Sequence, residues 1–184
     1  MEEKKLRVSA GEKNLERAHD WVKTADEKAG FTLTISIALL GASLFVIEPA
    51  TRVVTESVSR GQWYWALIVP LCVVFAVYIY SDLRAIWLLI EVVKPRTTPT
   101  TKRQSPLFFG TIASMELEAF KARMRSMGHE ELLNEISDQT YIASEIAAMK
   151  YSNLHLAFSK LVVAVIAGIL FIGLTAITSA IMLP

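Results

Sequence analysis

The stretch LVVAVIAGILFIGLTAITSAIML, residues 161–183, decides the fold of this 184-residue chain. It contains no Asp, Glu, Lys or Arg, and a helix crosses a bilayer with about 20 apolar residues. Residues 29–47 and 63–80 are also uncharged. Aromatic residues stand at both ends of the 63–80 segment, as expected for rings that favour the two membrane interfaces. We therefore predict three transmembrane helices over these three segments.

Composition agrees with a membrane protein and excludes other classes. Hydrophobic residues make up 53% of the chain, and its charges are confined to a few blocks. The formal net charge of +1 offers no basic field for DNA or RNA, so no nucleic-acid polymer is expected as a partner. The sole cysteine, Cys72, excludes an internal disulfide.

Basic residues predict the orientation, because Lys and Arg near the ends of spans are retained on the cytoplasmic side. Seven occur in residues 1–28, two in residues 48–62 and ten in residues 81–160. We expect a cytoplasmic N-terminus, a periplasmic loop at 48–62, a cytoplasmic region at 81–160 and a C-terminus outside.

The cytoplasmic parts are predicted to be helical as well. One apolar stripe precedes the first span at steps of three and four residues. Residues 1–28 are therefore predicted to be a cytoplasmic amphipathic helical segment, in which the helix starts near Gly11. That stripe comprises Leu15, Ala18, Val22, Ala25 and Ala29. The second span keeps helical periodicity until Pro95.

The middle of the chain is predicted to be irregular. Residues 95–114 hold three prolines and five threonines, which favours a loop, and its apolar PLFFG piece should fold back onto protein. A short amphipathic helix is expected from Met115, closed by Gly128.

The last element is predicted to be one very long helix. No proline occurs between Glu130 and Leu183, and 54 residues of helix extend about 81 Å. Its cytoplasmic half carries a coiled-coil stripe. The stripe comprises Leu133, Ile136, Thr140, Ala143, Ala147, Tyr151, Leu154, Phe158 and Leu161. The predicted fold class is an all-α membrane protein whose three transmembrane helices extend into a cytoplasmic helical collar.

Three ordered motifs resemble the Pycsar transmembrane effectors of bacterial anti-phage defence. They are an Ala-Asp-x-Lys-Ala box (Ala25, Asp26, Lys28, Ala29), a Phe-Phe-Gly segment (Phe108, Phe109, Gly110) and LLNEISDQTYIASEIAAMKYSNL at 132–154. The resemblance covers nearly the whole chain. It implies an inner-membrane effector that responds to cyclic CMP or cyclic UMP, made by a separate cyclase, and impairs the membrane, causing abortive infection. It assigns no ligand contact to any residue.

Enzyme motifs are absent from the sequence. The three histidines lack metal-ligand spacing, and no HExxH, GxSxG, P-loop or CxxC pattern occurs, so we expect neither catalysis, nor a metal, nor a cofactor besides the activating nucleotide. A cyclic nucleotide needs cations for its phosphate and an aromatic face for its base. Candidate ligand contacts are Arg84, Arg96, Lys102, Arg103, Phe109, Arg123, Tyr141 and Lys150. Cytoplasmic retention of basic residues alone also explains most of the bases among them.

Two readings of the Asp26 and Lys28 box stay open. The charges either couple a sensing collar to the spans or form a structural pair with another collar helix. Three spans per chain hardly enclose a conducting path, so we expect a homo-oligomer in the lipid bilayer. Small residues at four-residue spacing, such as Ala164 and Gly168, favour close helix packing between or within chains. The alternative functions are a membrane anchor that recruits a cytoplasmic partner and a constitutive small channel.

Overall fold

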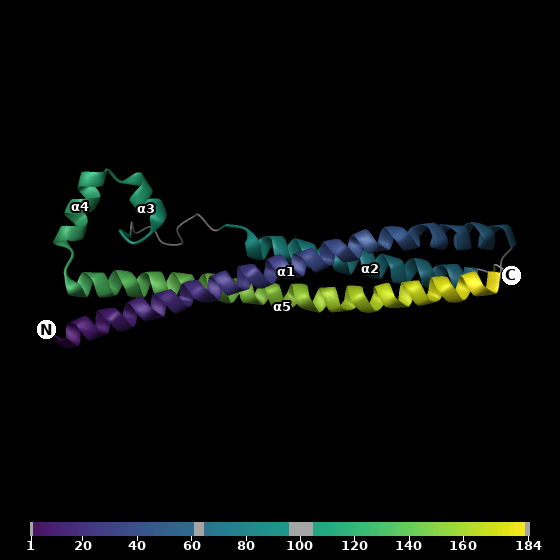
Figure 1. The fold of residues 1–184 in the computed structure, drawn as a ribbon, viewed down its shortest axis with the longest axis horizontal. Coiled ribbons are helices and arrows are strands. Elements are labelled where there is room, and N and C mark those ends of the chain that lie inside the picture. The colour runs from purple at the N-terminus through teal and green to yellow at the C-terminus, as the bar shows by residue number, and fades with distance from the viewer. Residues whose placement is uncertain (1, 61–64, 96–104, 183–184) are drawn as a thin grey trace. The chain divides into compact units, whose positions relative to one another are not determined.

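The structure is a computed structural model that describes residues 2–60, 65–95 and 105–182. Its described residues form five α-helices and no strand (Figure 1). The helices are α1 (Glu2–Arg60), α2 (Trp65–Val93), α3 (Phe109–Ser114), α4 (Leu117–Ser126) and α5 (His129–Met182). Three of them, α1, α2 and α5, are long and apolar enough to cross a membrane. The predicted all-α class with three such helices is confirmed.

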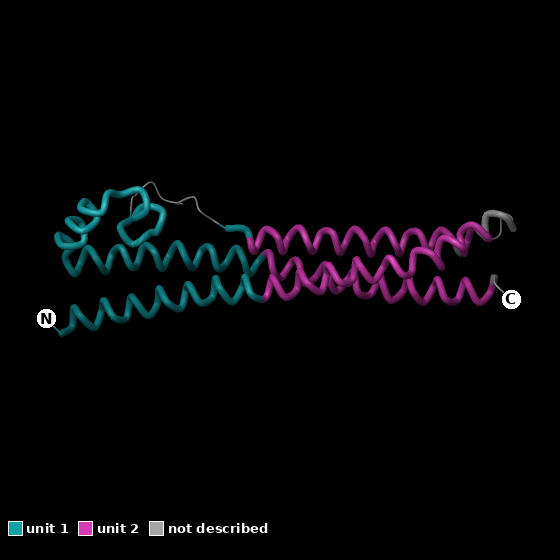
Figure 2. The backbone as a smooth tube through the Cα atoms, turned by 45° about the horizontal axis from the view of Figure 1, so that its top comes forward, with its two compact units in different colours: residues 1–27, 94–152 teal, residues 28–93, 153–184 magenta. Residues whose placement is uncertain are grey.

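The chain divides into two compact units, coloured separately in Figure 2. Unit 1 consists of residues 1–27 and 94–152, and unit 2 of residues 28–93 and 153–184. The division falls inside α1 and inside α5, so each of these two helices contributes residues to both units.

In unit 1, α1 and α5 run parallel. The Lys4 ammonium is 3.2 Å from the Glu130 carboxylate near the start of both helices, and Asp26 forms an ion pair with Lys150 farther along both. Small residues of both helices fill the space between these pairs, with Ala18, Ala25, Ala143 and Ala147 all buried. Alanine allows two helix backbones to approach closely.

In unit 2, α2 packs with the later parts of α1 and α5 (Figures 1 and 2). The ring centroids of Phe75 and Phe171 lie 4.8 Å apart, and the Tyr78 hydroxyl donates a hydrogen bond to the Leu39 carbonyl at 2.7 Å. Beside that bond, a Cβ on Gly168 would stand 3.4 Å from the Tyr78 ring. Aromatic side chains therefore fill the centre of this bundle.

Buried positions on α1 and α5 recur at alternating steps of three and four residues, and we call each such row the inner seam of its helix. On α1 the seam comprises Gly11, Leu15, Ala18, Val22, Ala25, Ala29, Thr32, Ser36, Leu39, Ser43, Val46, Ala50 and Val53, all buried or half-buried. On α5 it comprises Leu133, Ile136, Thr140, Ala143, Ala147, Lys150, Leu154, Ala157, Leu161, Ala164, Gly168, Phe171, Thr175 and Thr178. This average of 3.5 residues is the coiled-coil repeat.

The stripe predicted for the long helix is wrong at two positions. Lys150 and Ala157 occupy the inner seam of α5, whereas Tyr151 is half-buried and Phe158 is 55% exposed. Both errors follow from a step of four residues where the repeat requires three. The hydrophobic pattern favoured Tyr151 over its neighbour Lys150, because lysine is charged and tyrosine is largely apolar.

Helix boundaries match the sequence prediction for α2, α4 and α5 to within about two residues and differ elsewhere. The prediction that the first helix starts near Gly11 is wrong, because α1 begins at Glu2, with Glu2 and Glu3 in its first turn. Acidic residues at a helix N-terminus are favoured by the helix dipole.

Two predicted irregular segments contain helix. Residues 48–60, expected as a connection, continue α1 through Pro49, because Ala50 and Val53 still pack against α2 and α5. The predicted loop at 95–114 contains α3, and its residues 96–104 lie outside the described part of the chain. The location of residues 48–62 outside the bilayer stays a prediction.

Candidate functional site

The charged site of unit 1 lies at the end of its α1–α5 contact. Lys150 occupies the inner seam of α5, and its side chain is only 5% exposed. Its ammonium forms an ion pair with the Asp26 carboxylate, whose side chain is 37% exposed. A buried ammonium needs a counter-charge because its desolvation costs several kcal/mol. The Asp26 carboxylate therefore stabilises Lys150 at this position.

The box that contains Asp26 spans the division between the units. Unit 1 ends at Glu27 on α1, and unit 2 begins at Lys28. The Lys28 side chain is exposed. The main-chain carbonyl of Lys28 accepts a hydrogen bond from the Thr32 hydroxyl at 2.7 Å. Asp26 thus pairs with a second collar helix, as the structural reading of the box expects, while Lys28 occupies the surface.

The Phe-Phe-Gly segment forms a compact turn in unit 1. Ser105 and Pro106 are buried, and the Ser105 carbonyl accepts a hydrogen bond from the Phe108 amide at 3.2 Å. A Cβ on Gly110 would stand 2.6 Å from the Phe108 ring, so only glycine fits at this position without a shift. The prediction that PLFFG folds back onto protein holds for Pro106, which is buried, and in part for Leu107 and Phe108, which are half-buried.

Phe109 projects from this turn. Its side chain is 65% exposed, and its ring centroid lies 4.8 Å from that of Phe108. An exposed aromatic face supported by a second ring is suited to stacking a nucleobase.

Arg123 on α4 forms an ion pair with Glu131 in the first turn of α5. Both side chains are partly exposed, at 40% and 33%. A phosphate that approached Arg123 would compete with this carboxylate. Tyr141 on α5 is 66% exposed, and the Glu145 carboxylate raises the pKa of its phenol by accepting its hydrogen bond and by its negative charge.

The described candidates for ligand contact lie on different helices. Arg84 lies on α2 in unit 2, exposed, while the described candidates of unit 1 lie on α3, α4 and α5. Tyr141 and Lys150 are nine residues apart and so lie on opposite faces of α5. Arg96, Lys102 and Arg103 lie outside the described residues.

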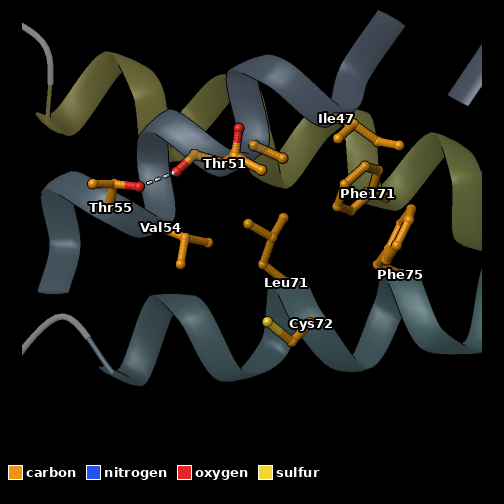
Figure 3. Close-up of a pocket in the computed structure, with 9 residues that line it drawn as sticks. Ile47, Thr51, Val54, Thr55, Leu71, Cys72, Phe75 and Phe171 are labelled. Carbon is orange, nitrogen blue, oxygen red and sulfur yellow. Dashed lines mark hydrogen bonds between the residues drawn. The ribbon is translucent and has the colours of Figure 1, made fainter. Parts of the chain in front are cut away.

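Unit 2 contains an apolar cavity of about 270 Å³ (Figure 3). Residues of α1, α2 and α5 line it: Ile47, Ala50, Thr51, Val54, Thr55, Leu71, Cys72, Phe75 and Phe171. The Thr55 hydroxyl donates to the Thr51 carbonyl at 2.9 Å, and no lining residue is charged. This cavity is therefore unsuited to a phosphate, and it places the sole cysteine at an exposed position beside the bundle.

Sequence reasoning missed the pairing of Asp26 with Lys150. The seam spacing could have revealed it, since steps of three and four residues place Asp26 beside seam residue Ala25 and place Lys150 in the α5 seam. Sequence reasoning also ended the second span at Tyr80. It therefore overlooked Asp82, whose side chain is fully buried in α2.

Comparison with known proteins agrees with this architecture. A family model described as the Pycsar effector protein domain matches residues 10–178. No curated protein and no solved structure matches the chain significantly. The family match includes the box on α1, the Phe-Phe-Gly turn and nearly all of α5. The chain therefore belongs to the Pycsar effector family, which supports a role as a membrane effector of anti-phage defence.

Proposed function

We propose that this protein binds cyclic CMP or cyclic UMP in unit 1 and responds by breaching the bacterial inner membrane with the spans of unit 2. The observation that carries the proposal is the sharing of α1 and α5. Each helix continues without interruption from unit 1 into unit 2, and the Asp26–Lys150 ion pair joins the two helices two residues before unit 2 begins on α1.

Unit 1 offers chemistry for an anionic nucleotide. Phe109 supplies an exposed aromatic face for the base, and Arg123 supplies a guanidinium for the phosphate. The phosphate would displace Glu131 from Arg123, which would free the first turn of α5 from α4. The other predicted cations, Arg96, Lys102 and Arg103, precede the Phe-Phe-Gly turn in the sequence and stay candidates from the sequence alone.

We do not expect the three spans of one chain to conduct alone, because buried side chains fill the centre of unit 2 among the described residues. Leu71, Phe171 and Tyr78 fill the centre of unit 2. Outward residues of α5 such as Ile166, Ile169 and Leu170 are more than half exposed and apolar, as lipid contact or helix association in a membrane requires. We therefore propose that the active form is a homo-oligomer whose subunits rearrange on activation.

Membrane damage can be tested in bacteria that express the full chain. Membrane potential and dye entry are followed with and without a co-expressed cyclase that makes cyclic CMP or cyclic UMP. We expect depolarisation only when a nucleotide is present. Depolarisation without a nucleotide would assign the protein to the constitutive channels, and no depolarisation despite confirmed expression would favour a recruiting anchor.

Binding can be measured separately from damage. Calorimetry of the purified protein in nanodiscs tests the nucleotide directly, and Arg123→Ala and Phe109→Ala should each weaken binding by about tenfold or more, as lost charge-assisted and stacking contacts do. Lys121→Ala on the same helix is the matched control, since Lys121 pairs with Glu118 within α4. Equal losses in all three variants would contradict the assigned contacts.

The sole cysteine provides a reporter of the response. Cys72 is exposed on α2, so a spin label attached to it measures distances between copies of the chain without further mutation. Nucleotide should change these distances in the native protein and leave them unchanged in Asp26→Ala.

A further inference from the structure

Asp82 is the only acidic or basic residue among the described side chains of unit 2 that is buried, and its side chain is fully inaccessible. It stands in the row of α2 residues that faces the bundle, four residues after Tyr78 and three before Ala85, both buried. This row continues the steps of three and four seen on α1 and α5. A carboxyl group thus occupies a position that this pattern gives to apolar residues.

The Asp82 carboxyl lies beside a hydroxyl of α1. The Ser36 side chain, fully buried on α1, interacts with it, yet neither carboxyl oxygen nor the Ser36 hydroxyl makes a hydrogen bond of good geometry within the described chain. Other seam hydroxyls in unit 2 behave differently. Thr32, Thr175 and Thr178 each donate to a carbonyl of their own helix at 2.7–2.8 Å.

No described cation can neutralise Asp82 inside the bundle. The residues that α1 and α5 bury in unit 2 are apolar or carry hydroxyls, and the buried Tyr78 phenol lies one helical turn before Asp82 on α2. Among the described side chains, the other titratable groups of the unit outside Tyr78, Tyr80 and Cys72 are exposed or half-buried: Lys28, Glu48, Arg52, Glu56, Arg84, Glu91, His155 and Lys160. An ionised carboxylate there would lack compensation for the loss of its water.

A bound metal ion does not fit the site. Hard cations such as calcium take about six to eight oxygen ligands, and no three metal-ligating side chains gather in the described part of the chain. A proton needs only the carboxyl itself, and a protonated carboxyl supplies the O–H donor that a serine oxygen accepts.

We propose that Asp82 carries a proton in the closed bundle of unit 2, with its O–H directed at Ser36, and that separation of the helices releases this proton. On opening, water reaches the carboxyl, the O–H bond breaks, the proton passes to water and the carboxylate remains. The closed form binds one proton more than the open form. Rising pH therefore favours the open form, by up to about tenfold per pH unit.

Infrared spectroscopy of the full chain in nanodiscs tests the protonation itself. At neutral pH we expect a carboxylic-acid C=O band that disappears in Asp82→Asn and persists in Asp20→Asn, whose side chain is exposed on α1. In Ser36→Ala the band should persist and move to higher frequency, because the hydrogen bond that we propose from the protonated Asp82 to Ser36 can no longer form. Identical spectra of the native protein and Asp82→Asn, or an unmoved band in Ser36→Ala, would overturn the proposal.

A second measurement addresses opening and does not require the nucleotide. Resistance of the bundle to unfolding by detergent should fall from neutral to alkaline pH in the native protein and stay constant in Asp82→Asn, which is uncharged and of the same size. Each measurement is repeated in sodium and in N-methylglucamine. A stabilisation by sodium that Asp82→Asn abolishes would assign the site to a cation and overturn the proton.

Discussion

The two units each bury a charged side chain between their helices, and they compensate it differently. In unit 1, the Lys150 ammonium, 5% exposed, is neutralised by Asp26 from the opposite helix. In unit 2, the fully buried Asp82 carboxyl interacts with the Ser36 hydroxyl, and no described cation of the unit is buried with it. Unit 1 lies in the part of the chain predicted to face the cytoplasm, whereas unit 2 contains the spans.

This difference suggests a division of tasks. An ion pair fixes the register of two helices, because removing either partner leaves an uncompensated charge. A buried carboxyl group without a counter-ion is stable only in its neutral, protonated form. Its protonation state can therefore change when water gains access to it. The paired charge therefore suits transmission of a signal, and the unpaired acid suits response to opening.

The largest effect is expected from breaking the ion pair of unit 1. Asp26→Ala removes the carboxylate that pairs with the buried Lys150 ammonium. We expect the free energy of unfolding to fall by about 2–4 kcal/mol, toward the lower end because the Asp26 side chain is over a third exposed. Chemical unfolding in mixed micelles measures the loss. The variant should also fail to depolarise cells when the nucleotide is present.

An apolar replacement separates stability from signalling. Asp26→Leu combined with Lys150→Met removes both charges, and such exchanges are often neutral or stabilising. We expect stability near that of the native protein with the nucleotide response still impaired. A double variant that responds normally would reduce the ion pair to a structural contact.

Removing the buried carboxyl group of unit 2 should stabilise the protein, whereas breaking the ion pair of unit 1 should destabilise it. Asp82→Leu replaces a buried polar group lacking good hydrogen bonds with an apolar side chain, and we expect a gain of roughly 1–3 kcal/mol. The same unfolding assay measures it. A loss of stability would mean that the carboxyl makes a stabilising interaction in the native bundle.

One glycine in each unit allows a test of helix packing with a smaller expected effect on stability. A Cβ at Gly11 would stand 3.1 Å from Ile136 Cγ2, whereas one at Gly168 would make ordinary contact with the Tyr78 ring at 3.4 Å. Alanine favours a helix over glycine by about 1 kcal/mol. Gly168→Ala should therefore raise the melting temperature. Gly11→Ala should raise the melting temperature by less, or lower it. Equal increases in melting temperature would show that Ile136 can move to accommodate the new methyl group at position 11 without a cost in stability.

The smallest effect is expected at the outer ion pair of unit 1. Lys4 and Glu130 also join α1 to α5, but their side chains are 62% and 84% exposed. Lys4→Ala should change stability by less than about 1 kcal/mol and leave nucleotide-dependent depolarisation intact. A large effect on signalling would mean that any link between these helices suffices, whether buried or not.

The sequence was sufficient for the helices, because uncharged runs and proline-free stretches report directly on length and burial. It was less informative where the decisive interaction joins distant residues. Lys150 and Asp82 have charged side chains, so hydrophobic periodicity placed Tyr151 in the stripe and ended the second span before Asp82. Their burial depends on Asp26 and Ser36 of another helix, which no local pattern contains. Arg123 was a candidate for the ligand site, yet its ion pair with Glu131 depends on a turn between two helices.

The regular repeat of the inner seams also constrains how this protein can evolve. Insertion or deletion of seven residues in α1 or α5 restores the buried row, whereas a change of one or two residues turns the helix beyond it by roughly 100° or 200°. Such a change would move Ala25 or Lys150 out of the interface. Length differences among relatives should therefore gather in the connections between helices, and any within α1 or α5 should come in groups close to seven.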